Sequence, residues 1–391
     1  MSNEVRRAKM RQAMEAQKLD ALILRLPENV LLLSGHWPMI GVVFLLFPRE
    51  GKTTLIFPEC YRQEVMANFE DCDPVSYLLG GAHHPPMFSA VGNLLRGRIL
   101  PSWKRIGYEG NFETAAPSWN AGEAIVPAAD SVALYKEVFA GRELVDATKL
   151  ILSERIRKTP YEIERMKIAS EVSCFGMAVF EELVKVGISG VELAAIVEKA
   201  IMIEGTGYRD AFRVRAFAQV STGDAETHVS HRPNIVSTKR PMADGDFAVL
   251  ELGVVADGYW ADRTRVQIAG TARDEQLKIY ETVRKAQEAA TSAIKPGVRA
   301  RDVDAAARNV IEAAGYGPDF PHITGHGLGF GYHESGPILG PNSEDVLEEG
   351  MLTSVEPGIY TAKYGGVRIE DDVAVTSSGS LVLGPFRKAC N

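Results

Sequence analysis

The 391-residue sequence lacks a long apolar run, closely spaced cysteines and an excess of basic charge. Its longest apolar stretch, Met39 to Phe47, is far shorter than the roughly 20 residues that a membrane-spanning helix needs. The charged N-terminus is not followed by the apolar core of a signal peptide. We therefore expect neither a membrane protein nor a secreted one.

The four cysteines are scattered along the chain, and no CxxC pair occurs among them. They are Cys60, Cys72, Cys174 and Cys390. This pattern is typical of reduced thiols in a cytoplasmic protein and argues against a disulfide framework or a zinc knuckle. We therefore expect a cytoplasmic location.

The net charge and the chain length further limit the classes of protein to which this sequence can belong. Lys and Arg total 43 against 51 Asp and Glu, a formal net charge of −8, so no nucleic-acid partner is expected. Hydrophobic residues at 46% and charged residues at 24% are typical of a soluble globular enzyme. At about 150 residues per domain, the length predicts two or three domains.

The first part of the chain has the pattern of a mixed α/β domain. Residues 3–18 predict a surface helix, because apolar residues recur there at helical spacing. Thr159-Pro160 is a helix-start signal, and we place the domain boundary just before it, giving domains 1–155 and 156–391. Short apolar runs between turn residues predict strands at 21–26, 30–33, 41–48, 53–58 and 105–109.

The second part contains a candidate internal repeat. Val186-Gly187-Ile188 and Pro296-Gly297-Val298 each follow a long amphipathic helical pattern, at an offset of 110 residues. The alternative is chance similarity between helix-capping glycines, which are common. At this offset Gly187, Gly205 and Gly207 correspond to Gly297, Gly315 and Gly317.

A predicted β-hairpin carries two carboxylates. Val249 to Gln267 is strand-like on both sides of Asp257-Gly258, a dipeptide typical of two-residue hairpin turns. With that turn, Glu251 faces Thr264, and Glu251 and Asp262 become diagonal neighbours on one face. Two such carboxylates repel unless a cation or proton lies between them, or unless both are solvated on an exposed face.

Histidines and further carboxylates follow the hairpin. His322, His326 and His333 lie within twelve residues, among glycines that allow close backbone approach to a ligand. Glu356 lies at a predicted strand end, and Arg368 and Glu370 are predicted to share one face of a strand. Four carboxylates and a histidine are enough to bridge two divalent ions of the Mn, Zn or Co type.

These motifs resemble the pita-bread superfamily of creatinase, prolidase, Xaa-Pro aminopeptidase and methionine aminopeptidase. The matching segments are Glu251-Leu252-Gly253, Gly258 to Arg265, the three histidines, Glu356 to Tyr360 and Gly365 to Asp371. The resemblance implies an α+β class: a C-terminal pita-bread fold with a pseudo-twofold repeat, preceded by a smaller α/β creatinase-type domain. It also implies a homodimer, and His36-Trp37-Pro38 is a candidate for reaching a neighbour's site.

The resemblance assigns roles residue by residue. Glu251, Asp262, His326, Glu356 and Glu370 fall on the metal-ligand positions, which implies two divalent ions (Mn, Co or Zn). His231, with His228 as its rival, corresponds to a further active-site histidine, and His333 and Glu356 complete the implied catalytic set. His322 and Arg368 match substrate-binding positions.

Glu251 departs from the pattern, because metal-dependent members carry aspartate there. The extra methylene moves the carboxylate by roughly 1.5 Å, which is large beside ligand distances of about 2.0–2.2 Å. Two functions follow. The first is metal-activated hydrolysis of the bond before proline in a small peptide. The second is metal-independent hydrolysis of a small non-peptide C–N bond, as in creatinase or ectoine hydrolase, and a non-catalytic binding scaffold is a third hypothesis.

Overall fold

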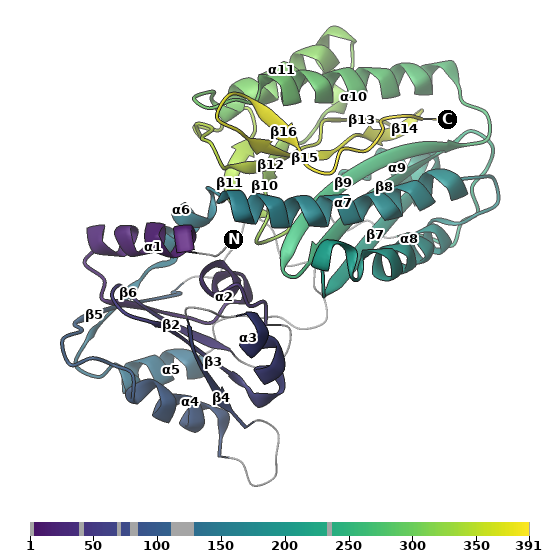
Figure 1. The fold of residues 1–391 in the computed structure, drawn as a ribbon. Helices are drawn as coiled ribbons and strands as arrows, with labels where there is room; N and C mark the ends of the chain where they lie inside the picture. The colour runs from purple at the N-terminus through teal and green to yellow at the C-terminus, as the bar shows by residue number, and fades with distance from the viewer. Residues whose placement is uncertain are drawn as a thin grey trace. The chain divides into compact units, whose positions relative to one another are not determined.

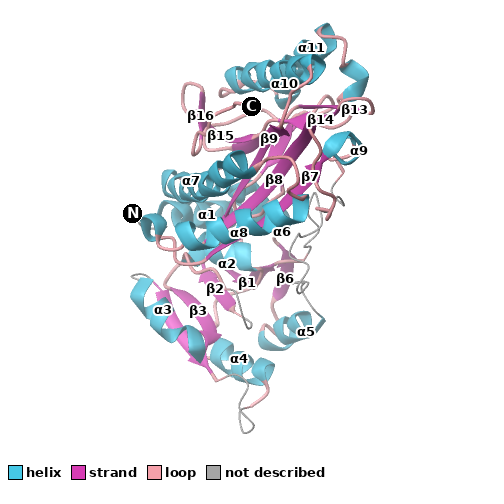
Figure 2. Cartoon of the chain, turned by 90° about the vertical axis from the view of Figure 1, so that its right-hand side faces the viewer, coloured by secondary structure: helices cyan, strands magenta, loops and turns pink. Residues whose placement is uncertain are grey.

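The computed structural model describes residues 4–38, 43–68, 72–78, 85–110, 129–232 and 237–390. Internal contacts divide the chain into two units, Met1–Arg155 and Ile156–Asn391. Figure 1 shows both units in chain order, and Figure 2 distinguishes their helices from their strands. Within the described residues, no helix combines the length and apolarity needed to cross a membrane. Among the described residues, none of the four cysteines forms a disulfide.

The N-terminal unit is a six-stranded mixed sheet with helices, in the strand order β4-β3-β2-β1-β5-β6. Its strands are β1 (Ala21–Leu24), β2 (Phe44–Pro48), β3 (Thr53–Pro58), β4 (Cys72–Tyr77), β5 (Arg105–Tyr108) and β6 (Glu143–Asp146). Its helices are α1 (Glu4–Ala16), α2 (Pro27–Ser34), the 3-10 turn η1 (Glu59–Tyr61), α3 (Arg62–Asn68), α4 (Met87–Arg96), α5 (Ala129–Val138) and α6 (Thr148–Arg155). The predicted α/β class is confirmed.

One predicted strand is wrong. Residues 30–33 lie inside helix α2, which begins at Pro27 and ends at Gly35 in the left-handed conformation (φ 75°). The start of the helix is capped from far away, because the buried Glu109 carboxylate accepts hydrogen bonds from the backbone N–H groups of Arg25 and Leu26. An apolar run of four residues is equally compatible with a strand and with a buried helix. The residue that decides for the helix is Glu109, which lies about 80 residues downstream and so gives no local signal.

His36 packs against a residue of its own unit. Its ring is buried at 3% exposure and packs edge-on against Tyr61, with 4.9 Å between ring centroids. His36 therefore contributes to the packing of its own unit, while the homodimer and the reach of His36-Trp37-Pro38 to a neighbour's site stay predictions.

The C-terminal unit contains two helix pairs and three sheets. The sheets are β7-β8-β9, β11-β10-β12-β15-β16 and β13-β14. The helices are α7 (Pro160–Leu183), α8 (Gly190–Gly205), η2 (Tyr208–Asp210), α9 (Gly223–His228), α10 (Asp274–Ala293), α11 (Ala300–Ala313) and η3 (Gly317–Asp319). The strands are β7 (Val214–Thr222), β8 (Asp246–Ala256), β9 (Tyr259–Ala269), β10 (Gly325–Gly327), β11 (Glu334–Leu339), β12 (Leu352–Val355), β13 (Gly358–Thr361), β14 (Gly365–Arg368), β15 (Asp371–Val375) and β16 (Ser380–Val382).

The two helix pairs begin alike, as the repeat predicts. Helices α7 and α8 pack on β7, β8 and β9, and α10 and α11 pack on strands from β10 to β14 (Figure 1). The Gly187 N–H donates to the Met242 carbonyl at 2.9 Å, and the Gly297 N–H donates to the Leu347 carbonyl at 2.8 Å. The donors of these equivalent backbone bonds are 110 residues apart and the acceptors 105, and this correspondence confirms the pseudo-twofold repeat.

The ends of the second helices do not keep that offset. Gly207 (φ 89°) and Gly315 (φ 91°) take the left-handed conformation, so the predicted pairing of Gly207 with Gly317 is wrong. The reason is a difference in helix length, since α8 has 16 residues and α11 has 14.

The β8–β9 hairpin has two buried faces with different contents. Ala248, Leu250 and Leu252 face the core under α7 and α8. On the opposite face, Phe247 and Val249 join the core under α10 and α11. Because side chains alternate along a strand, Glu251 continues the second face just where its apolar packing ends.

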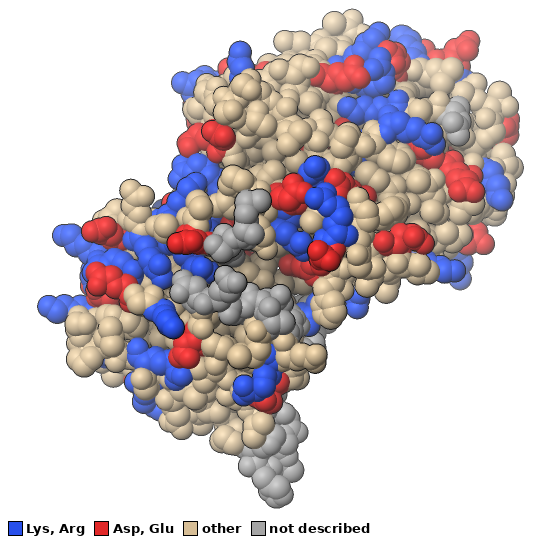
Figure 3. All heavy atoms as spheres, viewed as in Figure 1, with Lys and Arg blue, Asp and Glu red and all other residues tan. Residues whose placement is uncertain are grey.

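Surface charge is mixed in sign. On the face shown in Figure 3, Lys and Arg are interspersed with Asp and Glu. Many charged side chains of the described residues form ion pairs; Arg209, for example, contacts both Glu164 and Glu171. This face therefore lacks the basic stripe that would indicate a nucleic-acid partner.

The first helix of the C-terminal unit depends on a capping box. The Thr159 hydroxyl accepts from the Glu162 N–H, and the Glu162 carboxylate accepts from the Thr159 N–H at 2.7 Å. We predict that Thr159→Ala lowers the free energy of unfolding by about 1 kcal/mol in urea denaturation. The control Ser292→Ala, at an exposed position in the last turn of α10, should stay within about 0.5 kcal/mol of the wild type. Equal effects of the two changes would contradict the capping role.

Candidate metal centre

Carboxylates and histidines from β8, β9, β10 and three segments between strands meet on one face of the β8–β9 hairpin. Three groups have candidate ligand atoms that lie within 4.8 Å of one another. The groups are Asp262 with His326 and His333, His326 with Glu356 and Glu370, and Glu251 with Asp262 and Glu370. The five residues predicted as metal ligands thus lie together, and His333 joins them.

The hairpin has the predicted register. Asp257 (φ 50°) and Gly258 (φ 88°) form the turn, Glu251 lies opposite Thr264, and Gly253 lies opposite Asp262. Both carboxylates therefore project from one face, and Asp262 is buried at 1% exposure. The solvated alternative is excluded for Asp262.

The later carboxylates come from strand ends. Glu356 directly follows β12, as predicted. Glu370 was predicted on a strand, but it lies in the break between β14 and β15. The break lets its carboxylate meet the hairpin, where the Thr264 hydroxyl donates to Glu370 Oε2 at 2.6 Å.

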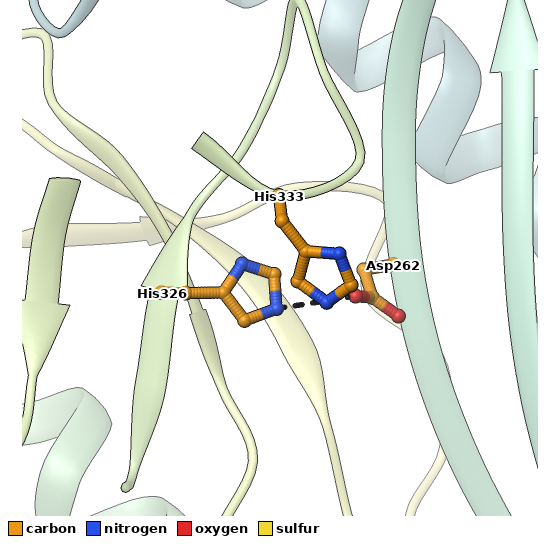
Figure 4. A group of neighbouring side chains, drawn as sticks. All are labelled: Asp262, His326 and His333. Atoms are coloured by element: carbon orange, nitrogen blue, oxygen red, sulfur yellow. Dashed lines mark ion pairs between the residues drawn. The ribbon is translucent and has the colours of Figure 1, made fainter. Parts of the chain in front are cut away.

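His326 presents one nitrogen to the carboxylates. Its Nδ1 lies 2.9 Å from its neighbour's carbonyl, that of Gly327, and donates to it when protonated. Its Nε2 then carries the lone pair and lies 3.5 Å from Asp262 Oδ2 and 3.4 Å from Glu356 Oε1. Figure 4 shows the imidazole rings of His326 and His333 side by side, with the Asp262 carboxylate next to them.

Burial opposes negative charge at this site. Burial, then the charge of Glu370, raises the pKa of Asp262 well above its ordinary value. Burial, then the charges of Glu370 and Asp262, does the same to the pKa of Glu356. A bound cation would relieve this repulsion and keep the carboxylates ionised.

Burial keeps His333 and His322 neutral. Burial, followed by the effect of His326, lowers the pKa of His333 to about 3, and burial lowers that of His322 to about 4. His322 Nε2 lies 2.9 Å from the Tyr360 hydroxyl. The His231 ring packs edge-on against the Tyr360 ring at 5.0 Å, whereas His228 Nδ1 lies 3.2 Å from the Tyr360 backbone carbonyl.

Arg368 links the carboxylates to this histidine cluster. Its side chain is buried among acceptors, donating to the Thr264 hydroxyl at 3.0 Å and to the Tyr360 hydroxyl at 3.2 Å. Its Nε also lies 3.9 Å from both Glu356 Oε2 and Glu370 Oε2. The guanidinium therefore partly neutralises the acidic cluster from one side.

Glu251 has its own set of donors. Its Oε2 contacts the Arg368 guanidinium and lies 3.3 Å from the Thr264 hydroxyl. Its Oε1 accepts from the Tyr332 hydroxyl at 2.6 Å. The longer side chain thus lies within the group that includes Asp262 and Glu370, while both of its oxygens are already engaged.

The residues fit a divalent cation. The buried Oε1 of Glu370 has no hydrogen-bond partner, although it points into a cluster of carboxylates with a deprotonated imidazole nitrogen. An unpartnered buried carboxylate oxygen is costly unless a cation binds it. Carboxylate oxygen and imidazole nitrogen are donors that Mn²⁺, Co²⁺ and Zn²⁺ share.

Sequence reasoning missed Tyr332. Its hydroxyl donates to Asp262 Oδ1 at 2.7 Å as well as to Glu251. The available signal was its position directly before His333, but an aromatic residue beside a motif is more often part of the core. Tyr360 also touches the site, through its hydroxyl.

A buried ion cluster fixes the segment that carries Glu370. The Arg265 guanidinium donates to the Glu370 carbonyl at 2.7 Å and to Asp371 Oδ1 at 2.6 Å. Lys388 Nζ lies 3.1 Å from Asp371 Oδ2. Burial alone would raise the pKa of Asp371, but the charges of Arg265, Arg263 and Lys388 lower it below its ordinary value.

The C-terminal unit consists of two similar halves, each with a helix pair packed on strands, and a cluster of four carboxylates and a histidine lies between them. This arrangement defines a metallohydrolase of the pita-bread superfamily. Residues 164–377 match metallopeptidase family M24, and residues 6–157 match the creatinase/prolidase N-terminal domain. The chain belongs to metallopeptidase family M24. Membership of this family implies divalent metal ions.

Relatives match over nearly the whole chain. The Xaa-Pro dipeptidase of Pyrococcus furiosus is 32% identical over 371 residues, covering 95% of this chain and 94% of the relative. The putative dipeptidase YkvY of Bacillus subtilis is 38% identical over 254 residues, covering 65% of this chain and 67% of the relative. Among solved structures, the prolidase of Pyrococcus horikoshii OT3 superposes with a TM-score of 0.79 at 28% identity, covering 98% and 99% of the two chains.

The Asp371 cluster makes a pH-dependent prediction. Asp371→Asn leaves two buried arginines without their counter-charge and should lower the free energy of unfolding by about 3–5 kcal/mol at pH 7. Because the folded-state pKa of Asp371 is depressed, this stabilisation is present above about pH 4 and is lost as the pH falls through the folded pKa.

Urea denaturation of both proteins between pH 3 and pH 7 checks this prediction. The difference between wild type and variant should shrink as the pH falls. The exposed change Glu182→Gln serves as the control and should alter stability by less than about 0.5 kcal/mol. A difference that is constant with pH would rule out a charge effect at Asp371.

Proposed function

We propose that this protein is an Xaa-Pro dipeptidase or aminopeptidase, a metal-dependent hydrolase of the bond before proline in small peptides. The observation that carries the proposal is the unpartnered Glu370 oxygen inside the cluster of Asp262, His326 and Glu356. Similarity to Xaa-Pro dipeptidases over 95% of the chain supports the choice of substrate.

In the proposed site, one set of residues would bind the metal ions and another set would bind the substrate. Glu251, Asp262, His326, Glu356 and Glu370 would hold two divalent ions of the Mn, Co or Zn type. When bound, such ions act as Lewis acids and lower the pKa of water, so that hydroxide is available near neutral pH. Among these residues, Glu356 would exchange a proton between water and the leaving nitrogen, the role that the family resemblance implies for it.

Neutral histidines suit the negative charge that develops on the scissile carbonyl oxygen. His333 and His231 can each donate an N–H there without carrying a full charge in the ground state. The packing of His231 against Tyr360 favours it over His228, which is engaged with a backbone carbonyl.

Arg368 and His322 would hold the substrate carboxylate. The guanidinium offers a planar pair of donors, and His322 adjoins it through the Tyr360 hydroxyl. In a dipeptide the terminal carboxylate lies one residue after the scissile bond. Because the Arg368 guanidinium lies close to the proposed metal ligands, it favours a substrate that is this short. We expect a homodimer from the family resemblance, and a cytoplasmic location from the scattered cysteines, which form no disulfide among the described residues.

Hydrolysis of Ala-Pro tests the function. We predict that dialysis against EDTA lowers proline release by roughly 100-fold or more, and that Mn²⁺ restores it. Because ligand binding stabilises the folded state, Mn²⁺ at 100 times its Kd should also raise the free energy of unfolding by about 2.7 kcal/mol. Glu370→Gln should lose both effects.

Other outcomes identify the rival functions. Undiminished turnover in EDTA, with no metal in the purified protein, would favour metal-independent hydrolysis of a C–N bond. Turnover of any substrate that His333→Ala abolishes would exclude a purely binding role.

Glu251→Asp separates a metal ligand from a dedicated catalytic group. The shorter side chain withdraws its carboxylate from Arg368, and we predict tighter Mn²⁺ binding, by about 10-fold, with Xaa-Pro cleavage retained. Calorimetric titration of the metal-free protein measures the affinity. Abolished cleavage at unchanged Mn²⁺ affinity would instead make Glu251 a nucleophile or base, as the metal-independent function requires.

A further inference from the structure

The Tyr332 hydroxyl joins two predicted metal ligands. It lies 2.6 Å from Glu251 Oε1 and 2.7 Å from Asp262 Oδ1, and the Tyr332 side chain is 6% exposed. A phenol has one proton for two acceptors, so both carboxylates share a single donor. Each contact uses one oxygen of its carboxylate, which leaves Asp262 Oδ2 facing His326 Nε2 at 3.5 Å.

Three aromatic rings hold the Tyr332 ring in place. Its centroid lies 5.1 Å from that of Phe217, 5.7 Å from that of Trp260 and 4.7 Å from that of His333, all in edge-on geometry. Edge-on pairs at these distances are favourable, and they restrict the ring to one orientation. The packing of the ring therefore fixes the position of the hydroxyl between the carboxylates of Glu251 and Asp262.

A glycine leaves room for this arrangement. A Cβ atom on Gly253 would lie 2.9 Å from Tyr332 Cε2 and 2.2 Å from Phe217 Cε1. Gly253 lies opposite Asp262 in the hairpin, two residues after Glu251. Any larger residue at this position would push the aromatic rings away from the carboxylates.

We propose that Tyr332 is a positioning residue of the metal centre, which ties Glu251 to Asp262 and orients both for a divalent ion. The ion concerned is the one bound by Glu251, Asp262 and Glu370, because Tyr332 contacts two members of that group. This inference rests on the proposed function, and it explains how a glutamate can serve where the resemblance implies aspartate. The hydroxyl holds Oε1 of the longer side chain at a fixed distance from Asp262.

Titration of the metal-free protein with Mn²⁺ tests the proposal. We predict that Tyr332→Phe keeps one ion and loses about 10- to 100-fold in affinity for the other, as removal of groups that orient metal ligands does elsewhere. Calorimetry resolves the two binding steps. Electron paramagnetic resonance adds a spectroscopic signature, since the signal of two coupled Mn²⁺ ions should give way to that of isolated Mn²⁺.

Two further variants keep the test decisive. Gly253→Ala retains the hydroxyl but displaces the ring, and the same selective loss is expected. In a Glu251→Asp background, Tyr332→Phe should have less effect than in the wild type, because the shorter carboxylate no longer reaches the phenol. The control is Tyr280→Phe, which removes a buried hydroxyl without a hydrogen-bond partner in the core under α10 and α11.

The outcomes are distinct. Two ions bound by Tyr332→Phe with wild-type affinity and a coupled signal would overturn the role of Tyr332 and leave the proposed function intact. Failure of the wild type to bind Mn²⁺ would overturn the proposed function itself. Equal losses of both ions in Tyr332→Phe would make Tyr332 a general structural residue, which also contradicts the proposal.

Discussion

Negative charge buried away from water is the constraint around which the C-terminal unit is built. Asp262 and Glu370 are each 1% exposed and lie within reach of Glu356 and Glu251. Carboxylates this close raise one another's pKa unless cations intervene. The chain supplies Arg368 on one side, and Arg265 secures the backbone of Glu370 from behind. The charge that remains unneutralised suits this cluster to binding divalent cations.

The repeat explains how such a cluster can be assembled from distant segments. Each half contributes one carboxylate shortly after a glycine with positive φ: Glu251 lies in β8 after Gly245, and Glu356 lies directly after β12, following Gly350. Asp262 then lies in β9, and Glu370 lies in the break between β14 and β15. The pseudo-twofold therefore places like residues opposite each other across the site. Two cation positions are a natural result of that symmetry.

Local signals in the sequence account for the hairpin, its register and the ends of the helix pairs. Asp257-Gly258 determines which residues face each other, because a two-residue turn allows one register. Sequence reasoning failed where distant contacts decide the outcome. Helix α2 is capped by Glu109, which is distant in the sequence. Glu370 lies in a strand break whose backbone is bound by Arg265. The Tyr332 ring is held near Glu251 by packing against Phe217, which belongs to a different strand. None of these contacts has a periodicity that a sequence pattern could reveal.

The two faces of the β8–β9 hairpin pack against different cores, and this limits which sequence changes the protein can accept in evolution. Phe247 and Val249 pack into an apolar core on the face that presents Glu251, while Leu250 packs into another core behind it. Inserting a single residue between Val249 and Glu251 would turn the carboxylate into the apolar core under α7 and α8. Homologues can therefore be expected to differ here by substitution, with length changes confined to the loops beyond β7 and β9.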